Sequence, residues 1–163
     1  MKTKDFGGSA LYVVFGILLA FGINQGMALA LSTDIPVVAV ESNSMVPTFQ
    51  RGDILVLQGV DIPNLIVGDI IVFSPPSQET PVVHRVIKIN DDGSVQTQGD
   101  ANTKQLPFEK RITQDQIHGK VITIVPYLGW VKIGMTEYVL PNIHWAILAI
   151  VLIIILYMLL YKI

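Results

Sequence analysis

Two long uncharged segments limit what this chain can fold into, because each is apolar enough to require burial away from water. No charged residue occurs from Phe6 to Thr33, and from Tyr138 to Tyr161 only His144 can carry a charge near neutral pH. With a rise of 1.5 Å per residue, either segment can cross a hydrocarbon layer of roughly 30 Å as a helix. The sequence therefore predicts two transmembrane helices with one domain between them.

Lysines at the two ends of the chain predict its orientation. Lys2 and Lys4 precede the first apolar segment, and Lys162 follows the second. Because cytoplasmic flanks of spans are rich in Lys and Arg, we expect both termini in the cytoplasm and the middle domain on the opposite side. An alternative for the first segment is a cleaved secretory signal ending at the small residues Ala28 and Ala30.

Composition divides the chain into an N-terminal transmembrane anchor (1–33), an extracytoplasmic β domain (34–137) and a C-terminal transmembrane helix (138–163). Short runs rich in Val and Ile, bounded by Gly, Pro and Asp, are typical of strands. The expected strands cover residues 37–40, 54–57, 70–73, 82–89, 95–98 and 119–125, with a hairpin turn at 90–93. The predicted fold class is a membrane-anchored all-β protein.

Charge and cysteine content exclude some classes of function. Between Asp34 and Glu137, eight Lys and Arg face twelve Asp and Glu, so the domain lacks the basic stripe that nucleic-acid binding requires. The chain has no cysteine, which excludes disulfides and thiolate metal sites. We expect no nucleic-acid partner, no metal and no organic cofactor.

A serine-containing turn follows the first expected strand. Its sequence is Ser42-Asn43-Ser44-Met45-Val46-Pro47-Thr48. Pro47 fixes its own φ and biases Val46 away from helix, so the turn is stiff and the direction of the Ser44 hydroxyl is fixed. A nucleophilic serine also needs a base and donors for an oxyanion, and Ser42 with the Ser44 amide could supply the donors. Taken alone, such a turn is better explained by backbone capping.

His84 is the histidine that best suits the role of base. It interrupts an apolar strand, where a buried imidazole needs a polar partner. Asp100 ends the strand expected to pair with that of His84, and its carboxylate could orient the imidazole. Structural alternatives are a histidine that bonds to a backbone carbonyl and an Asx turn at Asp100.

Five sequence blocks, in this order, resemble signal peptidase I, in the archaeal and endoplasmic-reticulum branch where histidine replaces the bacterial lysine. They lie at residues 42–48, 67–73, 84–86, 99–102 and 125–129. The resemblance implies a mostly antiparallel β fold and a serine endopeptidase that removes N-terminal signal peptides from exported preproteins after small residues. It implies Ser44 as nucleophile, His84 as general base, and Ser42 with the Ser44 amide as oxyanion hole.

The acidic residue that would orient His84 does not follow the family pattern. This branch usually has a second aspartate five or six residues beyond the Gly-Asp-x-Asn aspartate, and those positions here hold Gln105 and Leu106. We therefore assign Asp100 as the acid, with Glu109 as the alternative if the loop folds back.

The resemblance also implies partners and a location. The expected partners are preproteins that bear signal peptides and the lipid bilayer, with the protein-translocation machinery as a further candidate. We expect a multi-pass protein of the cell membrane, or of the endoplasmic reticulum membrane in a eukaryote, with the catalytic domain outside or in the lumen. The competing interpretation is a non-catalytic, membrane-tethered β module that binds protein partners.

Overall fold

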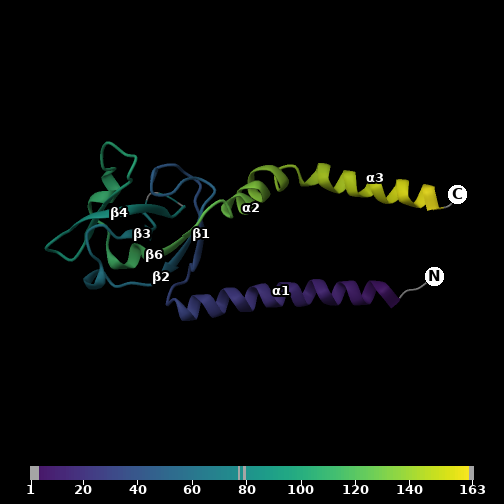
Figure 1. The fold of residues 1–163 in the computed structure, drawn as a ribbon, viewed down its shortest axis with the longest axis horizontal. Coiled ribbons are helices and arrows are strands. Elements are labelled where there is room, and N and C mark those ends of the chain that lie inside the picture. The colour runs from purple at the N-terminus through teal and green to yellow at the C-terminus, as the bar shows by residue number, and fades with distance from the viewer. Residues whose placement is uncertain (1–3, 77, 79, 162–163) are drawn as a thin grey trace.

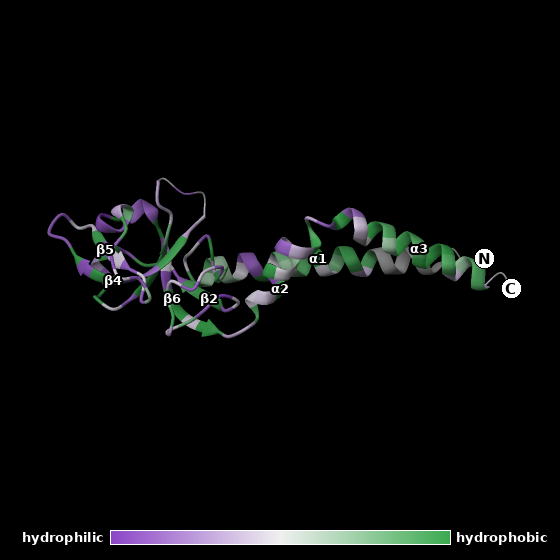
Figure 2. Cartoon of the chain, turned by 90° about the horizontal axis from the view of Figure 1, so that it is seen from above, coloured by the Kyte–Doolittle hydropathy of each residue, from purple (hydrophilic) through white to green (hydrophobic). Residues whose placement is uncertain are grey.

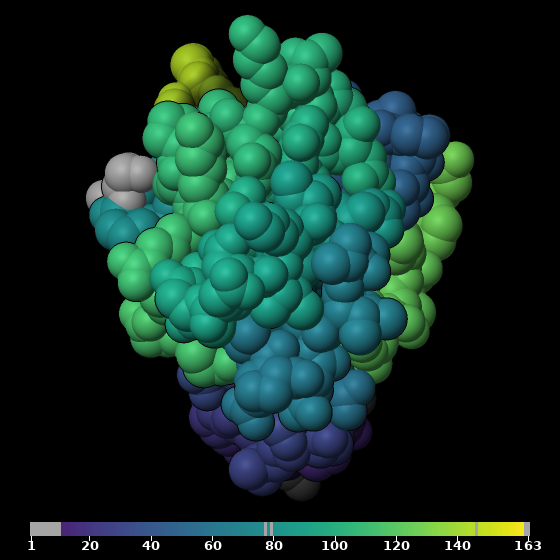
Figure 3. Space-filling model, turned by 90° about the vertical axis from the view of Figure 1, so that its left-hand side faces the viewer, coloured from purple at the N-terminus to yellow at the C-terminus, as the bar shows by residue number. Residues whose placement is uncertain are grey.

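The computed structural model describes residues 4–76, 78 and 80–161, which form one β domain and two long helices (Figure 1). The helix α1 spans Lys4–Ala30 and α3 spans Ile143–Tyr161. Both helices extend from the same side of the domain. The start of α1 and the end of α3 both lie at the end of the molecule that is far from the sheet (Figure 1). Figure 3 shows the opposite end of the domain, whose surface is formed by teal and green segments from the middle of the chain. Lys2 and Lys162, used to predict orientation, lie outside the described residues.

Both long helices are predominantly apolar and lie clear of the domain. The mean hydropathy is 1.9 over Leu11–Ala30 and 2.8 over Ile143–Tyr161, and neither segment is buried. The green that dominates both helices in Figure 2 contrasts with the mixed colours of the domain. A helix that is apolar on most sides needs a lipid or protein environment. The two helices are long and apolar enough to cross a membrane, which is compatible with the predicted spans.

The middle of the chain forms a six-stranded sheet in the order β1-β2-β6-β3-β4-β5, with every neighbouring pair antiparallel. The strands are β1 (Val37–Ala39), β2 (Ile54–Gln58), β3 (Ile70–Phe73), β4 (Val82–Ile89), β5 (Val95–Gln98) and β6 (Ile117–Val125). The predicted strands and hairpin turn are confirmed. β6 begins two residues earlier than predicted, because Gly119 lies inside the strand, where the Gln58 carbonyl leaves no room for a Cβ.

Short helical segments connect these strands to one another and to α3. They are η1 (Ile62–Asn64), η2 (Pro107–Lys110), η3 (Gln114–Gln116), α2 (Gly129–Gly134) and the π-helical turn η4 (Met135–Val139). Of these, η2 and α2 lie closest to the residues of interest below.

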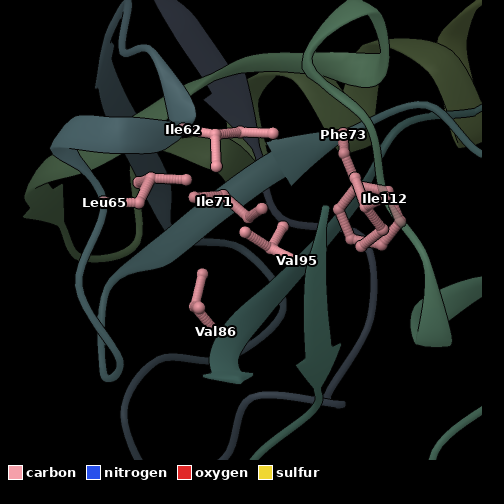
Figure 4. Packing of buried hydrophobic residues seen from close by; sticks show 7 residues of the cluster. All are labelled: Ile62, Leu65, Ile71, Phe73, Val86, Val95 and Ile112. Atoms are coloured by element: carbon pink, nitrogen blue, oxygen red, sulfur yellow. The ribbon is translucent and has the colours of Figure 1, made fainter. Parts of the chain in front are cut away.

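Apolar side chains pack on both faces of the sheet, because successive residues of a strand point in opposite directions. In β3, Ile71 and Phe73 join one core and Val72 joins the other. The first core contains Ile62, Leu65, Ile71, Phe73, Val86, Val95 and Ile112 (Figure 4). The second contains Val40, Met45, Phe49, Leu55, Leu57 and Val72. Met45 belongs to the serine turn and Phe49 directly follows it, so hydrophobic packing holds that turn on the sheet.

Two glycines with positive φ allow the packing around the serine turn to be tested. Gly52 has φ +96°, and a Cβ there would lie 2.1 Å from Nε1 of Trp130. Gly68 has φ +104°, with open space around its Cβ position. Gly68→Ala should cost about 1–2 kcal/mol of stability through backbone strain alone. Gly52→Ala should cost about 1–3 kcal/mol more, because the indole must move. Thermal unfolding of the detergent-solubilised variants measures the difference, and equal losses would contradict the close packing of Trp130.

Candidate active site

Ser44 and His84 meet although 40 positions separate them in the sequence. Ser44 lies half-buried in the turn between β1 and β2, and His84 lies in β4 with 3% of its surface exposed. The Ser44 Oγ is 3.0 Å from the His84 Nε2. His84 pairs with Ile71 in the register of β3 and β4, which places the imidazole on the face of the first core.

The other nitrogen of the imidazole, Nδ1, contacts Oε1 of Glu109, a fully buried residue of η2. The Leu106 amide donates to Oε2 at 2.6 Å, and the Thr97 hydroxyl donates to Oε1 at 3.4 Å. Since a carboxylate only accepts hydrogen bonds, Nδ1 carries the proton and Nε2 remains as acceptor for the Ser44 hydroxyl. The three side chains therefore have the order of nucleophile, base and orienting carboxylate.

Asp100 lies in a different place from the one predicted for the acid. Its carboxylate accepts from the Arg85 guanidinium at 2.8 and 2.6 Å and from the Thr48 hydroxyl at 2.5 Å. Within the part of the chain that the structure describes, no hydrogen bond joins Asp100 to His84. The physical reason is strand alternation: Arg85, the neighbour of His84, points to the opposite face of β4 and meets the loop after β5. The contact predicted for Asp100 is made instead by the alternative, Glu109.

The loop of residues 99–102 nevertheless positions the serine turn. The Ala101 amide donates to the Ser44 carbonyl at 2.9 Å. At Gly99, a Cβ would lie 2.8 Å from the His84 Nε2 and 2.7 Å from the Ser44 carbonyl oxygen. Only a glycine allows the loop to approach both residues this closely.

Two potential oxyanion donors lie beside the Ser44 hydroxyl. The exposed Ser42 has its Oγ 3.2 Å from the Ser44 Oγ. Among the described residues, the Ser44 amide has no acceptor. The structure therefore brings together Ser42 and Ser44 as the sequence predicted, with both donors available to a bound carbonyl oxygen.

A cleft of about 400 Å³ opens onto Ser44 and His84. Residues of β1, the start of β4, η2 and α2 line this cleft. Its apolar lining includes Val38, Val40, Phe49, Val82, Val83, Leu106 and Phe108. β1 is an edge strand of the sheet, so one side of its backbone has no strand partner among the residues that the structure describes. Among the described residues, no three His, Asp or Glu side chains are close enough to hold a metal ion.

The ion pair of Asp100 predicts a dependence of stability on pH. The hydrogen bond from Arg85, helped by that from Thr48, lowers the pKa of Asp100. A carboxyl with a lowered folded-state pKa stabilises the protein above its unfolded-state pKa of about 3.9, and this stabilisation disappears as pH falls through the folded-state value. Asp100→Asn should therefore lower the unfolding temperature at pH 7, and the difference from the parent should shrink below about pH 4.

The unfolding temperature is measured at pH values from about 7 to about 2.5, because carboxyl groups titrate within this range. Asp91→Asn, at an exposed position in the β4–β5 hairpin, is the matched control. If the difference in unfolding temperature between the parent and Asp100→Asn stays constant across this range, the result would contradict the stabilising role of the Asp100 charge.

Comparisons with known proteins agree with one another. The family described as "Signal peptidase, peptidase S26" matches residues 10–106. The signal peptidase complex catalytic subunit of Dictyostelium discoideum is 34% identical, over 77% of this chain and 76% of that protein. The human protein of the same description is 34% identical, over 80% and 72%. The one from Chaetomium globosum is 31% identical, over 76% and 78%.

Proposed function

The chain belongs to the signal peptidase family, peptidase S26, and we propose that Ser44, His84 and Glu109 are the residues with which it cleaves signal peptides. The observation that carries the proposal is the unbroken series of contacts from the Ser44 hydroxyl through both ring nitrogens of His84 to the buried Glu109 carboxylate. Asp100, the acid predicted from the sequence, acts instead as a structural partner of Arg85.

The geometry leads to a two-step acyl transfer. The Ser44 Oγ attacks the scissile carbonyl while its proton passes to the His84 Nε2. The Glu109 carboxylate stabilises the imidazolium that forms, and the Ser42 hydroxyl and Ser44 amide donate to the oxyanion. His84 then protonates the departing amine, and a water molecule activated by His84 releases the acyl group from Ser44.

The substrate is a preprotein whose cleavage region binds in extended form along the edge of β1. A peptide there gains backbone hydrogen bonds from the unpaired side of the strand. Val38, Val83 and Phe49 line the cleft that opens onto Ser44 and give it an apolar wall. An apolar wall favours uncharged side chains at the cleavage site, and the resemblance to signal peptidase I implies cleavage after small residues.

The enzyme is anchored in a membrane by α1 and α3, within the segments 1–33 and 138–163, and the catalytic domain (34–137) lies on the outer or lumenal side. The length and hydropathy of the two helices support the spans, and the terminal lysines of the sequence support the orientation. The relatives are described as catalytic subunits of a signal peptidase complex. By analogy, we propose the endoplasmic reticulum membrane or its prokaryotic equivalent as the location.

Substitutions at Ser44, Glu109 and Asp100 test the catalytic proposal. Ser44→Ala should reduce cleavage of a preprotein to background while leaving the unfolding temperature nearly unchanged, because a turn hydroxyl contributes at most about 1 kcal/mol. Glu109→Gln should lower kcat by a factor approaching 10⁴, because the amide cannot stabilise the imidazolium. Asp100→Asn should lower kcat roughly tenfold or less, because Asp100 is hydrogen-bonded to Arg85 and Thr48 and not to His84, so that its loss displaces the serine turn only slightly.

The assay is cleavage of a preprotein by the detergent-solubilised full chain, with the new N-terminus of the product sequenced. A severe loss in Asp100→Asn combined with a mild loss in Glu109→Gln would show that Asp100 is the acid in solution. Mild losses in both would reduce the site to Ser44 and His84.

A further inference from the structure

The segment that leads into α3 folds back onto the serine turn. Residues 127–137, which comprise α2 and the start of η4, are called here the brace segment. α2 lies between the sheet and α3 (Figure 1) and packs against β1. Its partners lie on either side of the nucleophile: Glu41 precedes the two serines, and residues 51–53 follow them.

Arg51 is the principal contact of the brace segment. Its Nη2 lies 2.5 Å from each carboxylate oxygen of Glu137. Its guanidinium carbon lies 5.5 Å from the centre of the Trp130 ring, within the range of a cation–π interaction. The Gly129 amide donates to the Gly52 carbonyl at 2.8 Å, so backbone and side-chain contacts hold the two segments together.

A hydrogen bond from the backbone of Arg51 connects the brace segment to the serine turn. Its amide donates to Oδ1 of Asn43 at 2.9 Å. Asn43 stands between Ser42 and Ser44, the oxyanion donor and the nucleophile of the proposed function. A displacement of the Arg51 backbone would therefore also displace Asn43, and with it the two serines.

A second ion pair acts on the other side of Ser42. Lys132 of α2 donates to Glu41 at 3.0 Å, and both residues line the cleft. Glu41 directly precedes Ser42 in the sequence. The brace segment thus contacts the chain both before and after the two serines.

We propose that the brace segment positions the Ser42–Ser44 turn for catalysis, with Arg51 and Glu137 as positioning residues. The C-terminal helical region is then part of the working enzyme and not only a tether, because the segment that contacts the serine turn leads through the end of η4 and a turn into α3. Exposed ion pairs contribute little to global stability, so the main effect of this pair is on local geometry. The inference rests on the proposed function of Ser44.

The test uses the full chain in detergent micelles and a short soluble peptide that contains a cleavage site but no apolar core. With such a substrate, membrane anchoring of the peptide plays no part in the rate. Glu137→Gln and Arg51→Gln should each lower kcat on the order of tenfold, while KM changes less than about twofold, because the defect lies in the alignment of the reacting groups. The kcat of the charge-exchanged variant, Arg51→Glu with Glu137→Arg, should be at least about threefold higher than that of either single variant.

Arg111→Gln is the matched control. It breaks an exposed ion pair of similar length, 3.0 Å to Asp92, at the β4–β5 hairpin. Its kcat should equal that of the parent. If Arg51→Gln does not fold, Glu137→Gln decides the test, because its side chain is 45% exposed and the substitution preserves its shape.

Three outcomes would overturn the inference. The first is a parent-like kcat in the Glu137→Gln variant. The second is a loss that charge exchange does not relieve, and the third is an equal loss in the Arg111→Gln control. Ser44→Ala is assayed in parallel: if it still cleaves the peptide, the proposed function fails, whereas an inactive Ser44→Ala with unaffected ion-pair variants removes only the positioning role.

Discussion

A carboxylate that is wholly removed from water destabilises a fold unless strong partners compensate it, and Glu109 is such a carboxylate. Its partners are the imidazole of His84, the amide of Leu106 and the hydroxyl of Thr97, which come from β4, the start of η2 and β5. All three elements must assemble before the charge is satisfied. The cost of burying Glu109 thus couples the folding of the first core to the placement of His84, the proposed base, beside Ser44.

The nucleophile is held by an independent set of interactions. Met45 and Phe49 bury the serine turn in the second core, and the loop at Gly99 and Ala101 holds it next to the imidazole. Ser44 therefore lies at the border between two cores, one of which fixes the serine and the other the base. Each of the two side chains is thus positioned mainly by packing within its own core, and the loop at Gly99 lies against both.

The strands were predictable because short Val- and Ile-rich runs end at Gly, Pro or Asp, and their register places His84 on a buried face. The contact of Ser44 with His84 was predictable from motifs. The position of Asp100 was not, because proximity along a hairpin does not determine which of two adjacent residues, His84 or Arg85, faces the next loop. The brace segment was not predicted either, since its ion pair joins residues that are 86 positions apart.

Glu109 places a carboxylate beside His84 although this chain lacks the second aspartate of the family pattern. At Leu106, one of the two positions where an aspartate is expected, the side chain has no carboxylate, but the backbone amide donates to Glu109 at 2.6 Å. Pro107 begins the turn of η2, which directs the Glu109 side chain back toward that amide and toward His84. The hydrogen bond from Leu106 holds one carboxylate oxygen, so that the other faces the imidazole. The path of the loop, rather than the position of an acid in a motif, thus decides which carboxylate contacts the base.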